Sequence, residues 1–104
     1  MAKTNKEIIT KMEEHLQLLW ERYYRNNLKM QLESNVERAE KYAQRAERAG
    51  NEAESVGHAY YILLKNLEIK TKLDTAKIQI DAMYYIRKMY AEEFEELKKK
   101  NLTA

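Results

Sequence analysis

Apolar residues recur every three or four positions along most of the chain. In its first third they are Ile9, Met12, Leu16, Leu19 and Tyr23. This spacing places them on one face of an α-helix, and the pattern weakens where the same phase reaches Asn26. Thr4 and Glu7 match a capping box, in which a hydroxyl and a carboxylate each meet a free backbone N–H. We therefore expect a first helix over residues 4–31.

The middle of the chain carries the longest seam in the sequence. Its steps of three and four alternate strictly through Val36, Ala39, Ala43, Ala46, Gly50, Ala53, Gly57, Tyr60, Leu64 and Leu67. Ser34 and Glu37 repeat the capping-box pattern just before it. Because the phase is kept across both glycines, we expect one continuous helix over residues 34–71. Gly50 and Gly57 would then let a second helix approach closely.

Gly50 also admits a second interpretation. Glycine is the favoured residue just past a helix end, and Asn51 with Glu54 could cap a new helix. A glycine inside a helix costs about 1 kcal/mol relative to alanine, so two of them need a reason. On this interpretation the chain is a hairpin of two very long helices.

The last third of the chain has two apolar faces. One runs through Leu73, Ala76, Ile80, Met83, Tyr90, Phe94 and Leu97, and the other through Ile78, Ala82, Tyr85 and Met89. We expect a third helix over residues 74–99 that touches more than one neighbour, with Thr71 or Asp74 as its cap. The run Lys98–Lys100 suits a helix C-terminus, where cations offset exposed carbonyls. Residues 101–104 are expected to form a frayed tail.

No segment of the sequence predicts a strand. The expected fold class is all-α, with a single domain over residues 1–104. We expect a long-helix bundle of three helices, or the two-helix hairpin, completed by self-association.

Composition narrows the classes of function. The net charge of +2 supplies no global field for nucleic acid or membrane, and the absence of cysteine excludes disulfides and thiolate zinc sites. Nothing resembles a signal peptide or a membrane span, so we expect a cytoplasmic protein without membrane contact. The low mean hydropathy of -0.82 fits long helices with narrow apolar stripes. Eight Tyr and one Trp argue against disorder.

Candidate chemistry is sparse. No nucleophile-and-base set or phosphate-binding glycine loop occurs. His15 lacks the glutamate three residues earlier that a di-metal bundle site needs, because Met12 stands there. Glu54 and His58 are a pair more typical of a surface hydrogen bond than of a metal site. We expect no enzyme activity, no cofactor and no metal.

Two groups of residues are candidate binding sites. The first combines residue types enriched in binding hot spots: Trp20, Arg22, Tyr24 and Arg25. The second is a basic stripe, spaced three, four and three, that should face away from the seam: Arg38, Lys41, Arg45 and Arg48. Such a stripe could bind phosphates, although a solubilising face is the more common use.

The leading hypothesis is a non-catalytic protein-interaction module, adaptor-like or inhibitor-like. It would form a homodimer or higher oligomer through the small-residue seam from Val36 to Tyr60, because shorter flanking helices would not cover that seam fully. It would also bind an unidentified protein partner. The alternative is a nucleic-acid-binding helical protein that uses the basic stripe.

Overall fold

The pattern predicted three long helices, and the structure differs in the last third of the chain. A computed structural model describes residues 4–71 and 73–103, without the side chains of 101–103. Within these ranges it contains four α-helices and no strand: α1 (Asn5–Leu32), α2 (Val36–Asn66), α3 (Thr75–Met89) and α4 (Ala91–Thr103). The all-α fold class is confirmed.

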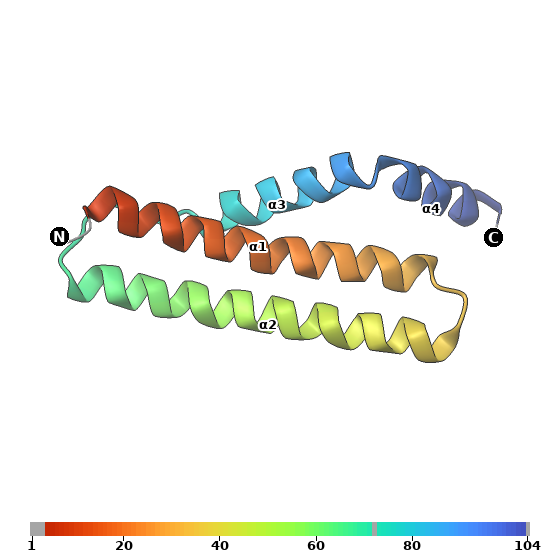
Figure 1. The fold of residues 1–104 in the computed structure, drawn as a ribbon, viewed down its shortest axis with the longest axis horizontal. Helices are drawn as coiled ribbons and strands as arrows, with labels where there is room; N and C mark the ends of the chain where they lie inside the picture. The colour runs from red at the N-terminus through yellow and green to blue at the C-terminus, as the bar shows by residue number, and fades with distance from the viewer. Residues whose placement is uncertain (1–3, 72, 104) are drawn as a thin grey trace.

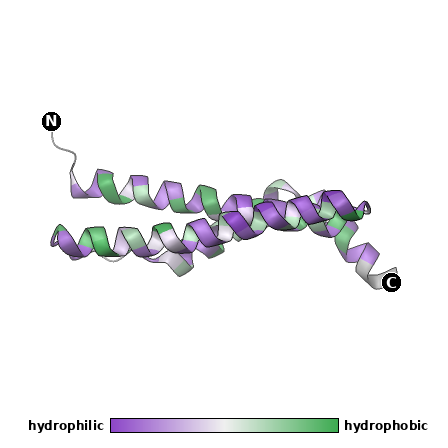
Figure 2. Ribbon diagram, turned by 90° about the horizontal axis from the view of Figure 1, so that it is seen from below, coloured by the Kyte–Doolittle hydropathy of each residue, from purple (hydrophilic) through white to green (hydrophobic). Residues whose placement is uncertain are grey.

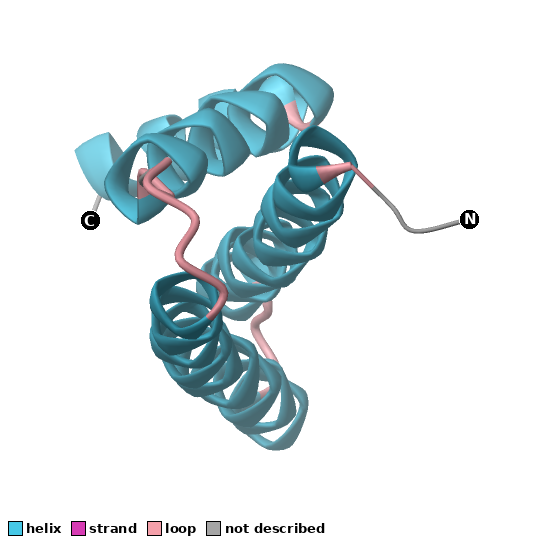
Figure 3. Cartoon of the chain, turned by 90° about the vertical axis from the view of Figure 1, so that its left-hand side faces the viewer, coloured by secondary structure: helices cyan, strands magenta, loops and turns pink. Residues whose placement is uncertain are grey.

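Helix α1 lies in the middle of the arrangement. It is antiparallel to α2, and α3 and α4 follow its other side in the same direction as α1 (Figure 1). Helix α1 contacts both α2 and α3 extensively, whereas α2 and α3 hardly touch each other. Seen along the bundle, α2, α1 and α3 form an open angle with α1 at its corner (Figure 3).

The central position of α1 follows from its two adjoining apolar faces. Leu16 and Tyr23 lie against the two glycines of α2, while the Tyr24 hydroxyl accepts a hydrogen bond from Gln79 of α3 at 3.1 Å. The buried cluster between the helices consists of Leu16, Leu19, Trp20, Ala53, Ile78 and Ala82. Removing these side chains from water is the main force that holds three helices on one another.

Side-chain caps set the helix starts. The Thr4 hydroxyl accepts from the Glu7 N–H at 3.2 Å, so the first predicted cap is confirmed. The second is one residue later than expected: Asn35, not Ser34, accepts from the Arg38 N–H at 3.0 Å. Asn35 and Ser34 are comparably good caps, so the sequence alone did not separate them. Asp74, one of the two expected caps, begins α3 by accepting from Lys77.

Helix α2 ends at Asn66, five residues before the predicted end at residue 71. Glu68 adopts a left-handed backbone with φ of 58°. Its N–H donates to the Lys65 carbonyl, and the Ile69 N–H donates to the Leu64 carbonyl. This hydrogen-bond pattern is the Schellman motif, which usually has glycine at the left-handed position. The end was missed because a glutamate stands there.

The predicted third helix is divided in two at Tyr90. That residue has φ of -113° and ψ of 39°, so it interrupts the helix between α3 and α4. The half-buried Tyr90 ring lies beneath the Arg25 guanidinium, 6.0 Å from its centroid. Helix α4 then continues to Thr103, through most of the expected frayed tail, and residue 104 lies outside the described range.

The buried face of α3 follows only part of one of the two predicted apolar faces. Ile78, Ala82 and Ile86 face α1 and are at most 6% exposed. Ile80, assigned to the first apolar face, is 48% exposed and points away from α1. Ile78 and Ala82 of the second predicted face therefore form the core with Ile86, whereas Tyr85 and Met89 of that face are 43% and 55% exposed. The two faces were equally apolar in the sequence, so spacing alone did not identify the buried one.

Both glycines lie inside α2, which is continuous as the leading interpretation predicted. From Ala46 to Gly57 the seam is buried against α1, while Val36 at its start is 79% exposed. Helix α1 thus covers the centre of the seam within one chain, which removes the argument that a second copy is needed there. Figure 2 shows that the hydrophobic residues of α2 gather toward its C-terminal end, whereas its N-terminal half is mostly hydrophilic.

Replacing Gly57 by alanine is expected to stabilise the protein. A Cβ at this position would lie 3.6 Å from Thr75 Cγ2 and 3.8 Å from Leu16 Cδ2, which are ordinary van der Waals distances. Alanine is favoured over glycine in a helix interior by about 0.5–1 kcal/mol. We expect the free energy of unfolding, measured by urea denaturation, to rise by about that amount.

Gly50→Ala provides the comparison. It gains the same helix propensity, but its added Cβ would meet a closer neighbour. A Cβ at Gly50 would lie only 3.1 Å from Tyr23 Cδ2. The Tyr23 ring is packed edge-on against Trp20 at 5.5 Å and Tyr24 at 5.0 Å between centroids, so it has little room to yield. We expect this variant to be less stable than Gly57→Ala. Equal stabilisation by both would contradict the close α1–α2 approach at Gly50.

Candidate functional site: an open groove along α1

A groove runs along α1 between α2 on one side and α3 and α4 on the other. It forms because α2 and α3 each pack on a different face of α1 and make few contacts with each other. Helices α2 and α3 approach each other at Gly57 and Thr75, where a Cβ on Gly57 would lie 3.6 Å from Thr75 Cγ2. Three adjoining hollows make up this groove.

Two hollows lie between α2 and α3 and share Trp20, Glu54 and Gln79. The first has a volume of about 440 Å³ and extends toward Gly57, His58, Tyr61, Leu73 and Thr75. The second, of about 410 Å³, extends toward Tyr23, Asn27, Met30, Ala43, Glu47, Gly50 and Asn51. Together they expose the line where α2 meets α1.

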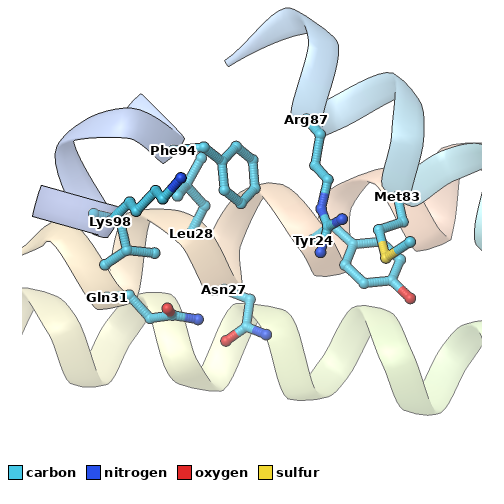
Figure 4. A pocket seen from close by; sticks show the side chains of 9 residues that line it. Tyr24, Asn27, Leu28, Gln31, Met83, Arg87, Phe94 and Lys98 are labelled. Carbon is cyan, nitrogen blue, oxygen red and sulfur yellow. The ribbon is translucent and has the colours of Figure 1, made fainter. Parts of the chain in front are cut away.

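The third hollow, of about 550 Å³, lies beneath the break between α3 and α4 and shares Asn27 with the second. Its apolar side chains come from three helices: Leu28 of α1, Met83 of α3, and Phe94 and Leu97 of α4. Figure 4 shows Phe94 over Leu28, with Arg87 and Lys98 at the rim on either side of the ring. The Arg87 guanidinium carbon is 6.0 Å from the centroid of Phe94.

The charges that border the groove are divided along its length. Glu47 and Glu54 stand on the α2 wall, and none of the described residues that line the first two hollows is a lysine or arginine. Arg87 and Lys98 border the third hollow. An occupant would therefore meet carboxylates along α2 and cations near α4.

The floor of the groove is an aromatic cluster on α1. The rings of Trp20, Tyr23 and Tyr24 contact one another, with Tyr23 edge-on to both neighbours. Trp20 is 8% exposed and belongs to the buried cluster. Packing therefore fixes the floor before any occupant arrives, which reduces the ordering cost of binding.

The predicted hot-spot residues do not form one exposed surface. Trp20 is buried, Arg22 is exposed, and Tyr24 lines the third hollow. Arg25 is half-buried beside Tyr90, and its Nε has no hydrogen-bond partner among the described atoms. The physical reason is that α1 is buried on two faces, so successive residues of this stretch point to different neighbours. Trp20 and Tyr24 reach the groove, and the two arginines do not line it.

The basic stripe is exposed at all four positions, as its phase predicts. Arg38 Nε lies 3.6 Å from Glu33 Oε1, and the Arg45 guanidinium carbon is 5.8 Å from the centroid of Tyr42. Lys41 and Arg48 have no ion-pair partner in the described part of the chain. Binding of nucleic acid by this stripe stays a prediction.

The two histidines lie apart from each other in the structure. His15 Nδ1 is 2.6 Å from the Tyr60 hydroxyl and joins α1 to α2, while His58 borders the first hollow. No group of three or more His, Asp or Glu side chains able to hold a metal ion occurs among the described residues. No helix in the described ranges is long and apolar enough to cross a membrane.

The groove was not predicted from the sequence, because it depends on how three helices meet. Asn51 and Gln79 became site residues only through this arrangement. The sequence contained one signal of the groove. Its last third has two apolar faces, and a single neighbouring helix can cover only one of them. Fold and groove together define an all-α protein with an unfilled position in its bundle. Comparison with protein-family models, curated proteins and solved structures gave no match.

Proposed function

We propose that the protein is a non-catalytic interaction module, adaptor-like or inhibitor-like, that accepts an amphipathic helix in the groove. The observation that carries this proposal is the unfilled angle between α2 and α3 above an aromatic floor. Laying the apolar face of a helix into such a groove is a common mode of peptide recognition. The bound helix would complete a four-helix arrangement.

The dimensions of the groove support a helical occupant. Its α2 wall runs from Ala43 to Tyr61, a distance of 18 residues or about 27 Å at 1.5 Å per residue. Helices in bundles pack with axes about 8–10 Å apart, so an occupant would lie directly on the residues that line the two hollows. Tyr23 and Tyr61 offer aromatic contact area of the kind that dominates binding energy.

A photo-crosslinking amino acid placed in the groove tests this function. We expect p-benzoylphenylalanine at Asn51, on the groove wall, to give covalent polypeptide adducts in cells that express the protein. The matched position is Ser55, exposed on the same helix but outside the residues that line the groove. Mass spectrometry should locate the adduct in a segment with apolar residues three and four apart. Equal adducts at both positions, or none at Asn51, would contradict the proposal.

A further inference from the structure

The outer face of α3 is apolar and basic. Ile80 and Tyr84 are 48% and 60% exposed, lie four residues apart, and point away from α1. Lys77, Arg87 and Lys88, all exposed, flank them. A helix that buries one face on α1 has no structural need for two large apolar side chains on the opposite face. This combination is typical of a helix with a second packing partner.

The groove is complementary in charge and polarity to this outer face of α3. Its α2 wall carries Glu47 and Glu54 above an apolar floor, so a basic amphipathic helix matches it in charge. The acidic residues of α2 and the basic residues of α3 also lie at similar heights along the bundle. Gly57 lies opposite Thr75, and since α2 and α3 are antiparallel, Glu54 is level with about residue 78 of α3 and Glu47 with about residue 85.

We infer that the occupant of the groove is α3 of a second copy of this chain, and that the two copies exchange α3 helices across a two-fold axis. This inference rests on the function proposed above and names its partner. In each groove, Ile80 and Tyr84 of the second copy face the α2 wall beside the aromatic floor. Lys77 of the incoming α3 is then level with Glu54, and Lys88 comes within a side chain's reach of Glu47.

Geometry sets the direction of the two-fold axis. When α2, α1 and α3 occupy three corners of a square, an axis parallel to the bundle brings α3 of each copy to the open corner of the other. The two α3 helices are then parallel and in register. An axis perpendicular to the helices would place α1 of the second copy where α2 already lies. The parallel dimer is closed, and it covers the groove and the outer α3 face of both copies at once.

Two charge-reversed variants provide the main test. We expect the wild-type protein, of 12.5 kDa, to show twice that mass by light scattering at tens of micromolar. Glu47→Lys with Glu54→Lys should weaken dimerisation at least about tenfold, and so should Lys77→Glu with Lys88→Glu. An equimolar mixture of the two variants should dimerise again, because both grooves of the mixed dimer then receive an α3 of opposite charge.

A control and a geometric measurement complete the test. Lys41→Glu with Arg48→Glu changes the net charge as much as the α3 variant but lies outside the groove, so the dimer should persist. The chain has no cysteine, so Ala76→Cys can report the register. In a parallel pair it should form a disulfide between copies, whereas Ala59→Cys on α2 should not.

A monomeric wild-type protein at tens of micromolar, or a mixture of variants that stays monomeric, would overturn the inference. Neither result would affect the proposed function itself. Adducts from position 51 to a different polypeptide would then show that the groove accepts a helix other than its own α3.

Discussion

Ile86→Ala is expected to lower the free energy of unfolding by about 2–5 kcal/mol, the range for truncating a buried isoleucine. The Ile86 side chain is 0% exposed and lies in the last turn of α3 before the break at Tyr90. Its loss would leave a cavity between α3 and α1, close to Met83 and Arg87 of the third hollow. Urea denaturation followed by circular dichroism would measure the change.

Ile80→Ala is the matched control, because the same truncation is made on the same helix. Ile80 is 48% exposed in the single chain, so its loss should change the unfolding free energy of the monomer by less than about 1 kcal/mol. It should, however, weaken the proposed dimer, in which Ile80 enters the groove. Measurements at low protein concentration separate the two effects. Equal destabilisation of the monomer by both variants would mean that α3 packs in the other register.

The fold was predictable from the sequence where a local signal existed. Apolar spacing predicted the helical segments, although the third is divided into α3 and α4, and the unbroken phase across Gly50 and Gly57 predicted one continuous α2. The cap at Thr4 was predicted because a hydroxyl three residues before a glutamate is a specific signature. These features depend on neighbours in sequence, which is why spacing alone identified them.

The errors occurred where tertiary packing decided between locally equal choices. Glu68 takes a left-handed conformation, and a glycine at this position would have predicted the end of the helix. Tyr90 interrupts a helix although neither glycine nor proline stands there. The buried face of α3 was ambiguous because Ile80 and Ile78 stand in equally apolar stripes. The groove was missed for the same reason, since its position follows from which stripe of α3 packs on α1.

The seam of α2 predicts self-association, but in the structure the centre of this seam is covered within one chain. The seam from Ala46 to Gly57 already packs on α1, so these small residues serve contacts within the chain. The apolar stripe without a neighbour is on α3 instead. Both the seam and this stripe are helical surfaces that need a partner, and only the arrangement in space shows which of them already has one.

Trp20→Ala is expected to be among the most damaging single substitutions in the chain. Truncating a buried tryptophan costs about 3–5 kcal/mol, a large part of the roughly 5–15 kcal/mol that stabilises a typical domain. Trp20 contacts the core of all three main helices and supports the Tyr23 and Tyr24 rings, so both the fold and the floor of the groove would suffer. Because Trp20 is the only tryptophan, circular dichroism rather than fluorescence must follow the unfolding.

Leu18→Ala is the control for this variant, because Leu18 is 57% exposed on the same helix and should cost less than about 1 kcal/mol. The pair also decides between two roles for Trp20. If it is a hot spot reserved for a partner, as the sequence alone suggested, Trp20→Ala would abolish binding and leave the melting temperature nearly unchanged. If it is a core residue that also forms the groove floor, stability falls first, and binding weakens because the three helices no longer hold the groove open.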